Sequence, residues 1–186
     1  MKNYKRGEIA KGILSILASG ALIFVFAAAP GLAHAAPLFK YFKPRSVRDR
    51  RKINQSLRVL RIRKLIKVYK KDGKNIVEIT ARGRKKMLAY SLREMKLSVP
   101  KKWDGWWRIV MFDIPQSKKT ARDAVSASIR KLGLFPIQRS VFVSPYLCKK
   151  EIDFIGEFFG VREHIIYVKA KEIEGAKKLK EYFCMM

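Results

Sequence analysis

Residues 44–80 read PRSVRDRRKINQSLRVLRIRKLIKVYKKDGKNIVEIT, and this stretch decides the fold of the N-terminal half. The first part predicts a helix beginning after Ser46, because a serine oxygen can accept a hydrogen bond from a free backbone N–H of the first turn. Asp49 follows three residues later, where an acid meets the positive end of a helix. Ile53, Leu57 and Leu60 recur at spacings of four and three, so they share one buried face.

The second part of the stretch predicts a β-hairpin. Past Lys64 the apolar period changes from helical to two, which is typical of strands. Asp72 and Gly73 separate the two predicted strands and provide a tight turn, because glycine readily takes a positive φ. Another helix is expected from Ala81 to about Lys96, although Gly83 weakens its first turn. Helix, hairpin and helix together predict a winged helix-turn-helix, whose recognition helix enters the major groove of DNA.

The charge of the chain is strongly positive and uneven. The formal net charge is +27, and residues 1–100 hold 25 of the 42 Lys and Arg residues but only 5 of the 15 acids. Such crowding repels itself, so a polyanion is the natural partner, although a solvated basic surface is the plainer interpretation. With the predicted winged helix, the expected partner is double-stranded DNA. The predicted contacts to base edges are Arg48, Arg51, Lys52 and Gln55. The predicted contacts to phosphates are Arg58, Lys71, Lys74, Arg82 and Arg84.

Residues 12–39 contain no Asp, Glu, Lys or Arg, and three interpretations compete for them. The first is an apolar helical segment at 12–39, broken at 30–31 and followed by a second helix over about 32–42, buried in the N-terminal domain. The second is a membrane span over 13–29, at the short end of the usual length. The third is a cleaved signal peptide. Seven Lys or Arg residues in 40–52 disfavour export, so we expect a cytoplasmic protein, with tethering to the inner face of the membrane as the alternative.

The C-terminal half predicts a second domain. We place the N-terminal domain at 1–96, a linker at 97–102 and the second domain at 103–186. Apolar and amphipathic segments follow one another in the order β-α-β-β-α-β, which is the ferredoxin-like plan. The fold class is therefore α+β, with a winged helix-turn-helix followed by a ferredoxin-like domain. Cys148 and Cys184 are far apart and isolated, so we expect neither a disulfide framework nor a zinc site, and no cofactor.

Several motifs of the second domain resemble a known family. They are WRIVMFDIP at 107–115, RDA at 122–124, KLG at 131–133, QRSVFV at 138–143 and PY at 145–146. Together they resemble the central domain of the PaaX family of transcriptional repressors, which is similar to the second Cas protein, a small CRISPR-associated endoribonuclease. The resemblance implies a homodimer formed through the ferredoxin-like domain, behind an N-terminal domain that reads DNA.

Asp113 is the catalytic candidate that this resemblance offers. It ends the first predicted strand of the second domain, where it looks like the acidic residue of the CRISPR-associated nuclease. In a symmetric dimer, two such carboxylates could share one Mg²⁺ that activates water for phosphodiester cleavage. The plainer interpretation is an aspartate that caps the next turn. Because no second acid or histidine lies near it in sequence, an enzyme is the less favoured interpretation.

The sequence therefore favours a DNA-binding transcriptional regulator, more specifically a repressor that reads a pseudo-palindromic site as a dimer. The first alternative is a magnesium-dependent nuclease, or a relative of the CRISPR adaptation proteins, that uses Asp113. The second alternative is a basic nucleic-acid-binding protein anchored in the membrane through residues 13–29.

Overall fold

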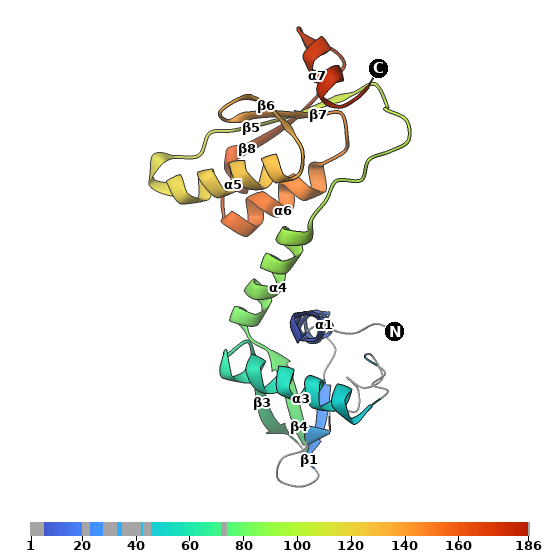
Figure 1. Cartoon of the computed structure of the whole chain (residues 1–186). Helices are drawn as coiled ribbons and strands as arrows, with labels where there is room; N and C mark the ends of the chain where they lie inside the picture. The colour runs from blue at the N-terminus through green and yellow to red at the C-terminus, as the bar shows by residue number, and fades with distance from the viewer. Residues whose placement is uncertain are drawn as a thin grey trace. The chain divides into compact units, whose positions relative to one another are not determined.

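The described part of the protein is a mixed α/β chain with two antiparallel sheets. The computed structural model describes residues 6–19, 23–27, 33–34, 42, 46–71 and 74–185 (Figure 1). The chain divides into two compact units, Met1–Ser91 and Leu92–Met186, which we call unit 1 and unit 2. Each unit has its own sheet and its own buried core.

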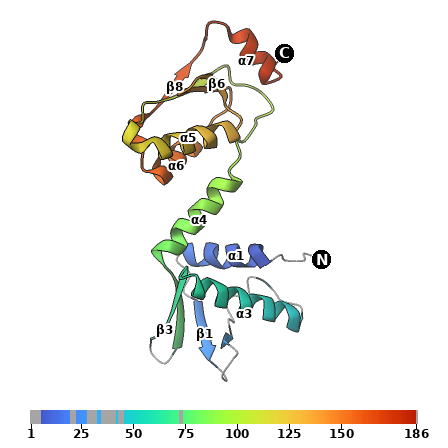
Figure 2. The same ribbon diagram turned by 60° about the vertical axis from the view of Figure 1, so that its left-hand side comes forward.

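Unit 1 combines helices with a sheet of strand order β2-β1-β4-β3, in which every neighbouring pair is antiparallel. The core lies where α1 and α3, which run side by side, pack against the sheet (Figure 2). Its described elements are α1 (Arg6–Ala18), β1 (Ile23–Ala27), β2 (Ala33–His34), α3 (Val47–Ile62), β3 (Ile66–Lys71), β4 (Lys74–Ile79) and α4 (Ala81–Glu94), whose last residues belong to unit 2.

The apolar segment at 12–39 differs from the expected helical pair. Helix α1 ends at Ala18, and the apolar run continues into β1, which pairs with β4. β1 reads IFVFA, and branched and aromatic side chains favour a strand over a helix. The second helix expected over about 32–42 is wrong at Ala33–His34, which form β2. The rest of that expected helix, except residue 42, and the Asp72–Gly73 turn lie outside the described residues.

The apolar face of α1 belongs to the core of unit 1. Ile13 and Leu14 are fully buried there, together with Ile9, Ile16 and Leu17. Within the described part of the chain, no helix is both long enough and apolar enough to cross a membrane.

The end of α3 places a lysine in the left-handed region. Lys64 has φ +56°, and its backbone N–H donates to the Arg61 carbonyl at 2.9 Å. The next N–H, of Leu65, donates to the Leu60 carbonyl at 2.9 Å. This pair of hydrogen bonds is the Schellman ending of a helix, in which glycine is the usual left-handed residue.

Replacing Lys64 with glycine should therefore stabilise unit 1. A side chain in the left-handed region costs about 1–2 kcal/mol, and the greater unfolded-state freedom of glycine offsets part of that gain. We expect a net increase of about 0.5–1 kcal/mol in the free energy of unfolding, measured by urea denaturation followed by far-UV circular dichroism. Lys85→Gly, the same change inside α4, should lower stability by about 1 kcal/mol. A Lys64→Gly variant that is less stable than the parent would contradict this account of the turn.

Unit 2 follows the β-α-β-β-α-β order that the sequence predicted. Its sheet has the order β6-β7-β5-β8, and every neighbouring pair is antiparallel. Helices α5 and α6 cover one face of the sheet, and α7 packs on part of the other (Figure 1). The described elements are β5 (Trp107–Phe112), η1 (Gln116–Lys118), α5 (Lys119–Lys131), β6 (Phe135–Gln138), β7 (Val141–Ser144), α6 (Lys149–Phe159), η2 (Arg162–His164), β8 (Ile165–Ala170) and α7 (Ala176–Tyr182).

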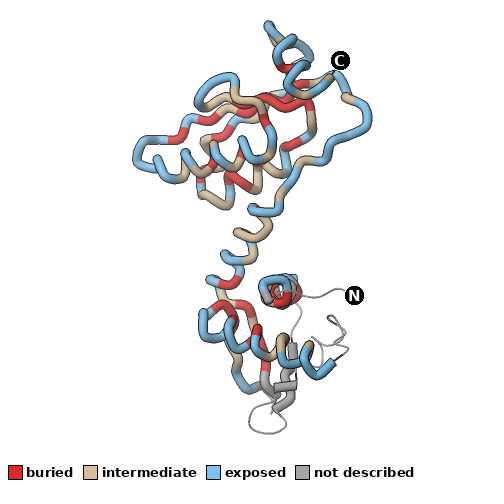
Figure 3. The backbone as a smooth tube through the Cα atoms, viewed as in Figure 1, coloured by how far each residue is buried: buried red, intermediate tan, exposed pale blue. Residues whose placement is uncertain are grey.

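The main core of unit 2 lies between its sheet and the α5/α6 layer (Figure 3). Leu92, Met95 and Leu97 pack against this core, although they precede the family-like motifs. These apolar contacts explain why unit 2 begins at Leu92, whereas the sequence places the linker at 97–102.

A buried arginine stabilises the loop that leads into β5 of unit 2. Arg108 is 1% exposed, and its guanidinium donates to the Pro145 carbonyl at 2.6 Å. It also forms an ion pair with Asp104, whose carboxylate accepts the Trp106 backbone N–H at 3.1 Å. Because a buried guanidinium needs a counter-charge, Asp104 fixes the loop that leads into β5.

This ion pair predicts a pH dependence of stability. The hydrogen bond from Arg108 is the largest cause that lowers the pKa of Asp104 to about 2; burial, the next largest, opposes it, and the hydrogen bond from the Trp106 backbone lowers the pKa further. Because the folded-state pKa lies below the unfolded value of about 3.9, the ionised carboxylate stabilises unit 2 above pH 4, and this contribution is lost as the pH falls toward 2. We expect Asp104→Asn to reduce the fall in stability between pH 4 and pH 2, followed by tryptophan fluorescence. Glu157→Gln, at an exposed position of α6, should keep the parent profile, and an unchanged profile in Asp104→Asn would refute the role of the pair.

Candidate nucleic-acid interface

Helix α3 is fixed in unit 1 by one buried face. Ile53, Leu57 and Leu60 are between 2% and 9% exposed and lie in the same core as α1. The helix begins as the sequence predicts, because the Ser46 hydroxyl oxygen accepts the Asp49 backbone N–H at 3.2 Å. Because the inner face is packed and the first turn is capped, the directions of the remaining side chains of α3 are fixed.

The outer face of α3 is basic. Arg48, Arg51, Gln55 and Arg58 are all exposed, and at 100° per residue they point into the half of the helix opposite the buried residues. The structure therefore brings four of the five predicted helix contacts onto one face. Lys52 is half-buried and lies at the flank of this face, beside the packed side. It is the least accessible of the five.

The hairpin beside α3 carries a small polar network. The Lys67 ammonium lies 3.0 Å from a Glu78 carboxylate oxygen, and the Tyr69 hydroxyl donates to the same carboxylate at 3.2 Å. These contacts lower the pKa of Glu78, with the hydrogen bond from Lys67 as the largest cause. Further along the ladder the backbones of Lys71 and Lys74 are direct partners at the turn end of the hairpin.

The start of α4 is fixed against the turn that follows α3. The Thr80 hydroxyl donates to the Lys64 carbonyl at 2.8 Å, and its oxygen accepts the Gly83 backbone N–H at 3.0 Å. A Cβ on Gly83 would lie 2.0 Å from the Leu65 carbonyl oxygen, so the helix approaches the chain at a distance that only glycine allows. The predicted phosphate contacts Arg82 and Arg84 are exposed in this first turn.

Asp113, the catalytic candidate, lies in unit 2. It follows β5 and is exposed, and its backbone N–H donates to the His164 carbonyl at 3.1 Å. Among the residues that the structure describes, no group of three or more His, Cys, Asp or Glu side chains could hold a metal ion. The magnesium site that Asp113 would share with a second copy of the chain remains a prediction.

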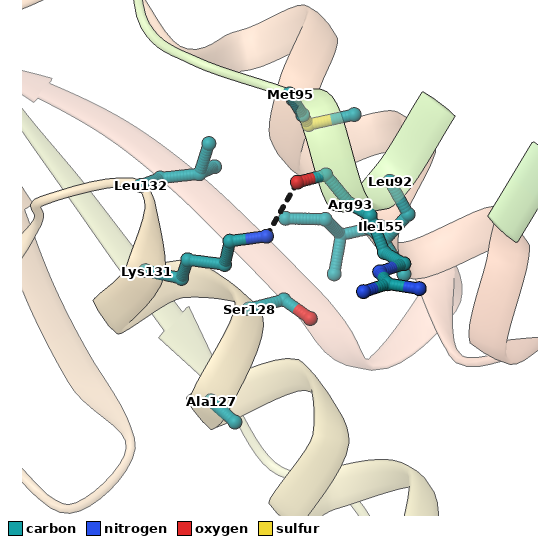
Figure 4. A pocket seen from close by; sticks show the side chains of 8 residues that line it. All are labelled: Leu92, Arg93, Met95, Ala127, Ser128, Lys131, Leu132 and Ile155. Atoms are coloured by element: carbon teal, nitrogen blue, oxygen red, sulfur yellow. Dashed lines mark hydrogen bonds between the residues drawn. The ribbon is translucent and has the colours of Figure 1, made fainter. Parts of the chain in front are cut away.

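A pocket of about 220 Å³ lies in unit 2 between residues 92–95 and the α5/α6 layer (Figure 4). Its wall is mostly apolar, and the Lys131 ammonium donates to the backbone carbonyl of Arg93. The sequence did not indicate it, because its lining comes from three separate segments. A phosphate backbone needs a row of exposed cations instead, so the pocket is not part of the candidate DNA surface. It is lined by Leu92, Arg93, Met95, Ala127, Ser128, Lys131, Leu132 and Ile155.

Residues 100–181 match the family model described as the PaaX protein central Cas2-like domain. Over these residues, unit 2 resembles a PaaX central domain. The match confirms the resemblance carried by the motifs at 107–146, and it is consistent with a PaaX family protein. A comparison with curated proteins finds no match.

The PaaX central domain indicates a transcriptional regulator of the PaaX type. The matched range includes Asp113, whereas the basic face of α3 and the hairpin lie before it, in unit 1. The candidate DNA contacts therefore depend on the geometry of unit 1 alone.

Proposed function

We propose that the protein is a transcriptional repressor of the PaaX type that binds double-stranded DNA through unit 1 and reads a pseudo-palindromic site as a dimer. The observation that carries this proposal is the outer face of α3, where Arg48, Arg51, Gln55 and Arg58 are exposed together on a helix whose other face is packed. Arginine and glutamine are side chains that form paired hydrogen bonds with base edges in the major groove.

The arrangement of unit 1 supports a winged helix. The hairpin β3–β4 follows α3 directly, and its second strand also pairs with β1, the strand after the first helix. In such a motif α3 is the recognition helix and the hairpin is the wing. In this arrangement Lys71 and Lys74 would reach phosphates from the wing, and Arg58, Arg82 and Arg84 would reach them from the helices.

The fold of unit 2 supports the dimer. With the strand order β6-β7-β5-β8, all pairs antiparallel and two helices on one face, we assign unit 2 to the ferredoxin-like class. On the opposite face a row of apolar residues crosses three strands: Val141 pairs with Met111, which pairs with Ile166. Ile166 is 59% exposed, and Ile137 nearby in the sheet is 45% exposed. We propose that a second copy of the chain covers this row.

Replacing Ile166 with glutamate tests the dimer. A charge in the covered row would be desolvated, so we expect at least a tenfold increase in the dimer dissociation constant, measured by sedimentation equilibrium. Ile62→Glu, at an exposed position in unit 1, should leave the dissociation constant unchanged. A parent protein that is monomeric at micromolar concentration, or an Ile166→Glu variant that dimerises normally, would disprove the proposed face.

The DNA-binding proposal is tested by incubating the purified protein with sheared DNA from its source at physiological salt and sequencing the retained fragments. A recurrent inverted repeat with half-sites one helical turn apart, or a multiple of it, is expected for a dimeric reader. Retention of DNA without any enriched sequence would mean backbone binding alone and would overturn the proposed function. Cleavage of the fragments with added Mg²⁺, lost in Asp113→Ala, would instead establish the nuclease alternative.

A further inference from the structure

Three large aliphatic side chains of helix α3 are exposed; Val59 is 37% exposed, and the other two are exposed much further. Val47 is 67% exposed and Ile62 is 69% exposed, whereas Ile53, Leu57 and Leu60 of the same helix are buried. Exposed aliphatic residues are common on protein surfaces, so exposure alone indicates no function. The position of Val47 beside the basic face, however, indicates a role in DNA recognition.

Val47 lies on the outer side of α3, one turn before Arg51. The two residues are four apart, so their side chains are neighbours on the helix surface. Val47 is the first residue of the helix, and the capping hydrogen bond from Asp49 to Ser46 fixes the turn that contains it. Its branched side chain has few rotamers, so the direction of its methyl groups is also restricted. Ile62 lies at the opposite end, about 22 Å along the helix axis at 1.5 Å per residue.

The position of Val47 matches a specific chemical feature of DNA. A recognition helix of this class presents its N-terminal residues to the base edges. Among the groups displayed in the major groove, the thymine C5-methyl is the apolar one that aliphatic side chains contact. An aliphatic side chain at the start of the helix, beside an arginine, therefore suits a thymine next to the base that the arginine reads.

We infer that Val47 is a specificity-determining residue that contacts the C5-methyl group of a thymine adjacent to the base pair read by Arg51. This inference rests on the proposed DNA-binding function and adds to it the composition of the half-site. Arg51 supplies the hydrogen bonds to one base, and Val47 selects its neighbour by apolar contact. Ile62, too far along the helix to reach the same base step, does not contribute to this selection.

The test uses the full-length protein and the inverted repeat recovered from the retained DNA. Each thymine of the repeat is replaced in turn by deoxyuridine, which removes the methyl group and leaves the base pairing intact. One methyl group contributes about 0.8 kcal/mol, so loss of the contacted methyl should weaken binding about fourfold in one half-site and about sixteenfold in both. The effect should occur at one thymine position per half-site.

Two variants decide whether Val47 is responsible. Val47→Ala should bind the thymine and deoxyuridine repeats equally, because the contact is already lost. Ile62→Ala, which is matched in exposure and removes one aliphatic carbon more than Val47→Ala, should keep the full sensitivity to deoxyuridine. Alanine is tolerated at both exposed helix positions, and circular dichroism checks that the fold is retained.

The outcomes separate this inference from the function on which it rests. A recovered repeat with no position sensitive to deoxyuridine would overturn the role of Val47 and leave the proposed repressor intact. The same conclusion would follow if Val47→Ala remained sensitive to deoxyuridine. Absence of any recovered repeat would overturn both proposals, since neither base edges nor methyl groups would then be read.

Discussion

Gly83→Ala is expected to unfold unit 1 while unit 2 remains folded. The new Cβ would lie 2.0 Å from the Leu65 carbonyl oxygen and 2.7 Å from the Ile79 side chain. The Leu65 carbonyl also accepts the Thr80 backbone N–H at 3.0 Å, so displacing it breaks the hydrogen bonds that join α4 to the end of α3. We expect a loss of about 3 kcal/mol or more, a large part of the stability of a small domain.

The distribution of tryptophan makes this prediction measurable. All three tryptophans, Trp103, Trp106 and Trp107, belong to unit 2. The variant should therefore lose far-UV helical signal and DNA binding at a temperature where tryptophan fluorescence is unchanged. Gly7→Ala in α1, where a Cβ meets nothing within 4 Å, should be neutral or slightly stabilising. A Gly83→Ala variant as stable as Gly7→Ala would show that the close approach is not needed for folding.

Arg51→Ala is expected to remove most of the preference for the specific site. Arg51 lies in the middle of the outer face of α3, in the N-terminal half of the helix. A well-placed arginine–base contact contributes about 1–3 kcal/mol of discrimination, so binding to the recovered repeat should weaken about 10- to 100-fold. Binding to random DNA should change little, because the non-specific term depends on the total phosphate contacts. Fluorescence anisotropy titrations with both DNAs measure the two effects.

Arg139→Ala is the matched control for this experiment. It removes the same charge from an exposed turn of unit 2 and should preserve the ratio of specific to random affinity. If Arg51→Ala kept that ratio as well, α3 would not be the recognition helix. A uniform loss on both DNAs would instead assign Arg51 to the phosphate backbone.

The helix α3 and the hairpin could be predicted from sequence because their signals are local. Ser46, the spacing of Ile53 and Leu57, and the change of period after Lys64 depend on residues a few positions apart. The course of residues 23–27 could not be predicted in the same way. Their apolar run suits a helix as well as a strand, and pairing with β4, about 50 residues later, decides between the two.

The candidate site was predicted in composition but not in detail. The sequence groups basic residues on α3, yet it does not show that Lys52 lies at the flank while Arg51 and Gln55 are exposed. From the sequence, Gly83 is predicted only to weaken the helix, because helix propensity does not include the Leu65 carbonyl that lies against this glycine. The exposure of Val47 depends on the tertiary packing of the inner face and has no signal of its own in the sequence.

The packing of Leu92, Met95 and Leu97 determines where a domain can be joined in chimeras of related proteins. The family match begins at residue 100, so a chimera designed on that match would join a foreign segment directly to the central domain. Its α5/α6 layer would then lose three of the side chains that pack against it. A junction before Leu92 carries these side chains with their core, so chimeras joined there should be soluble, whereas those joined at residue 100 should aggregate.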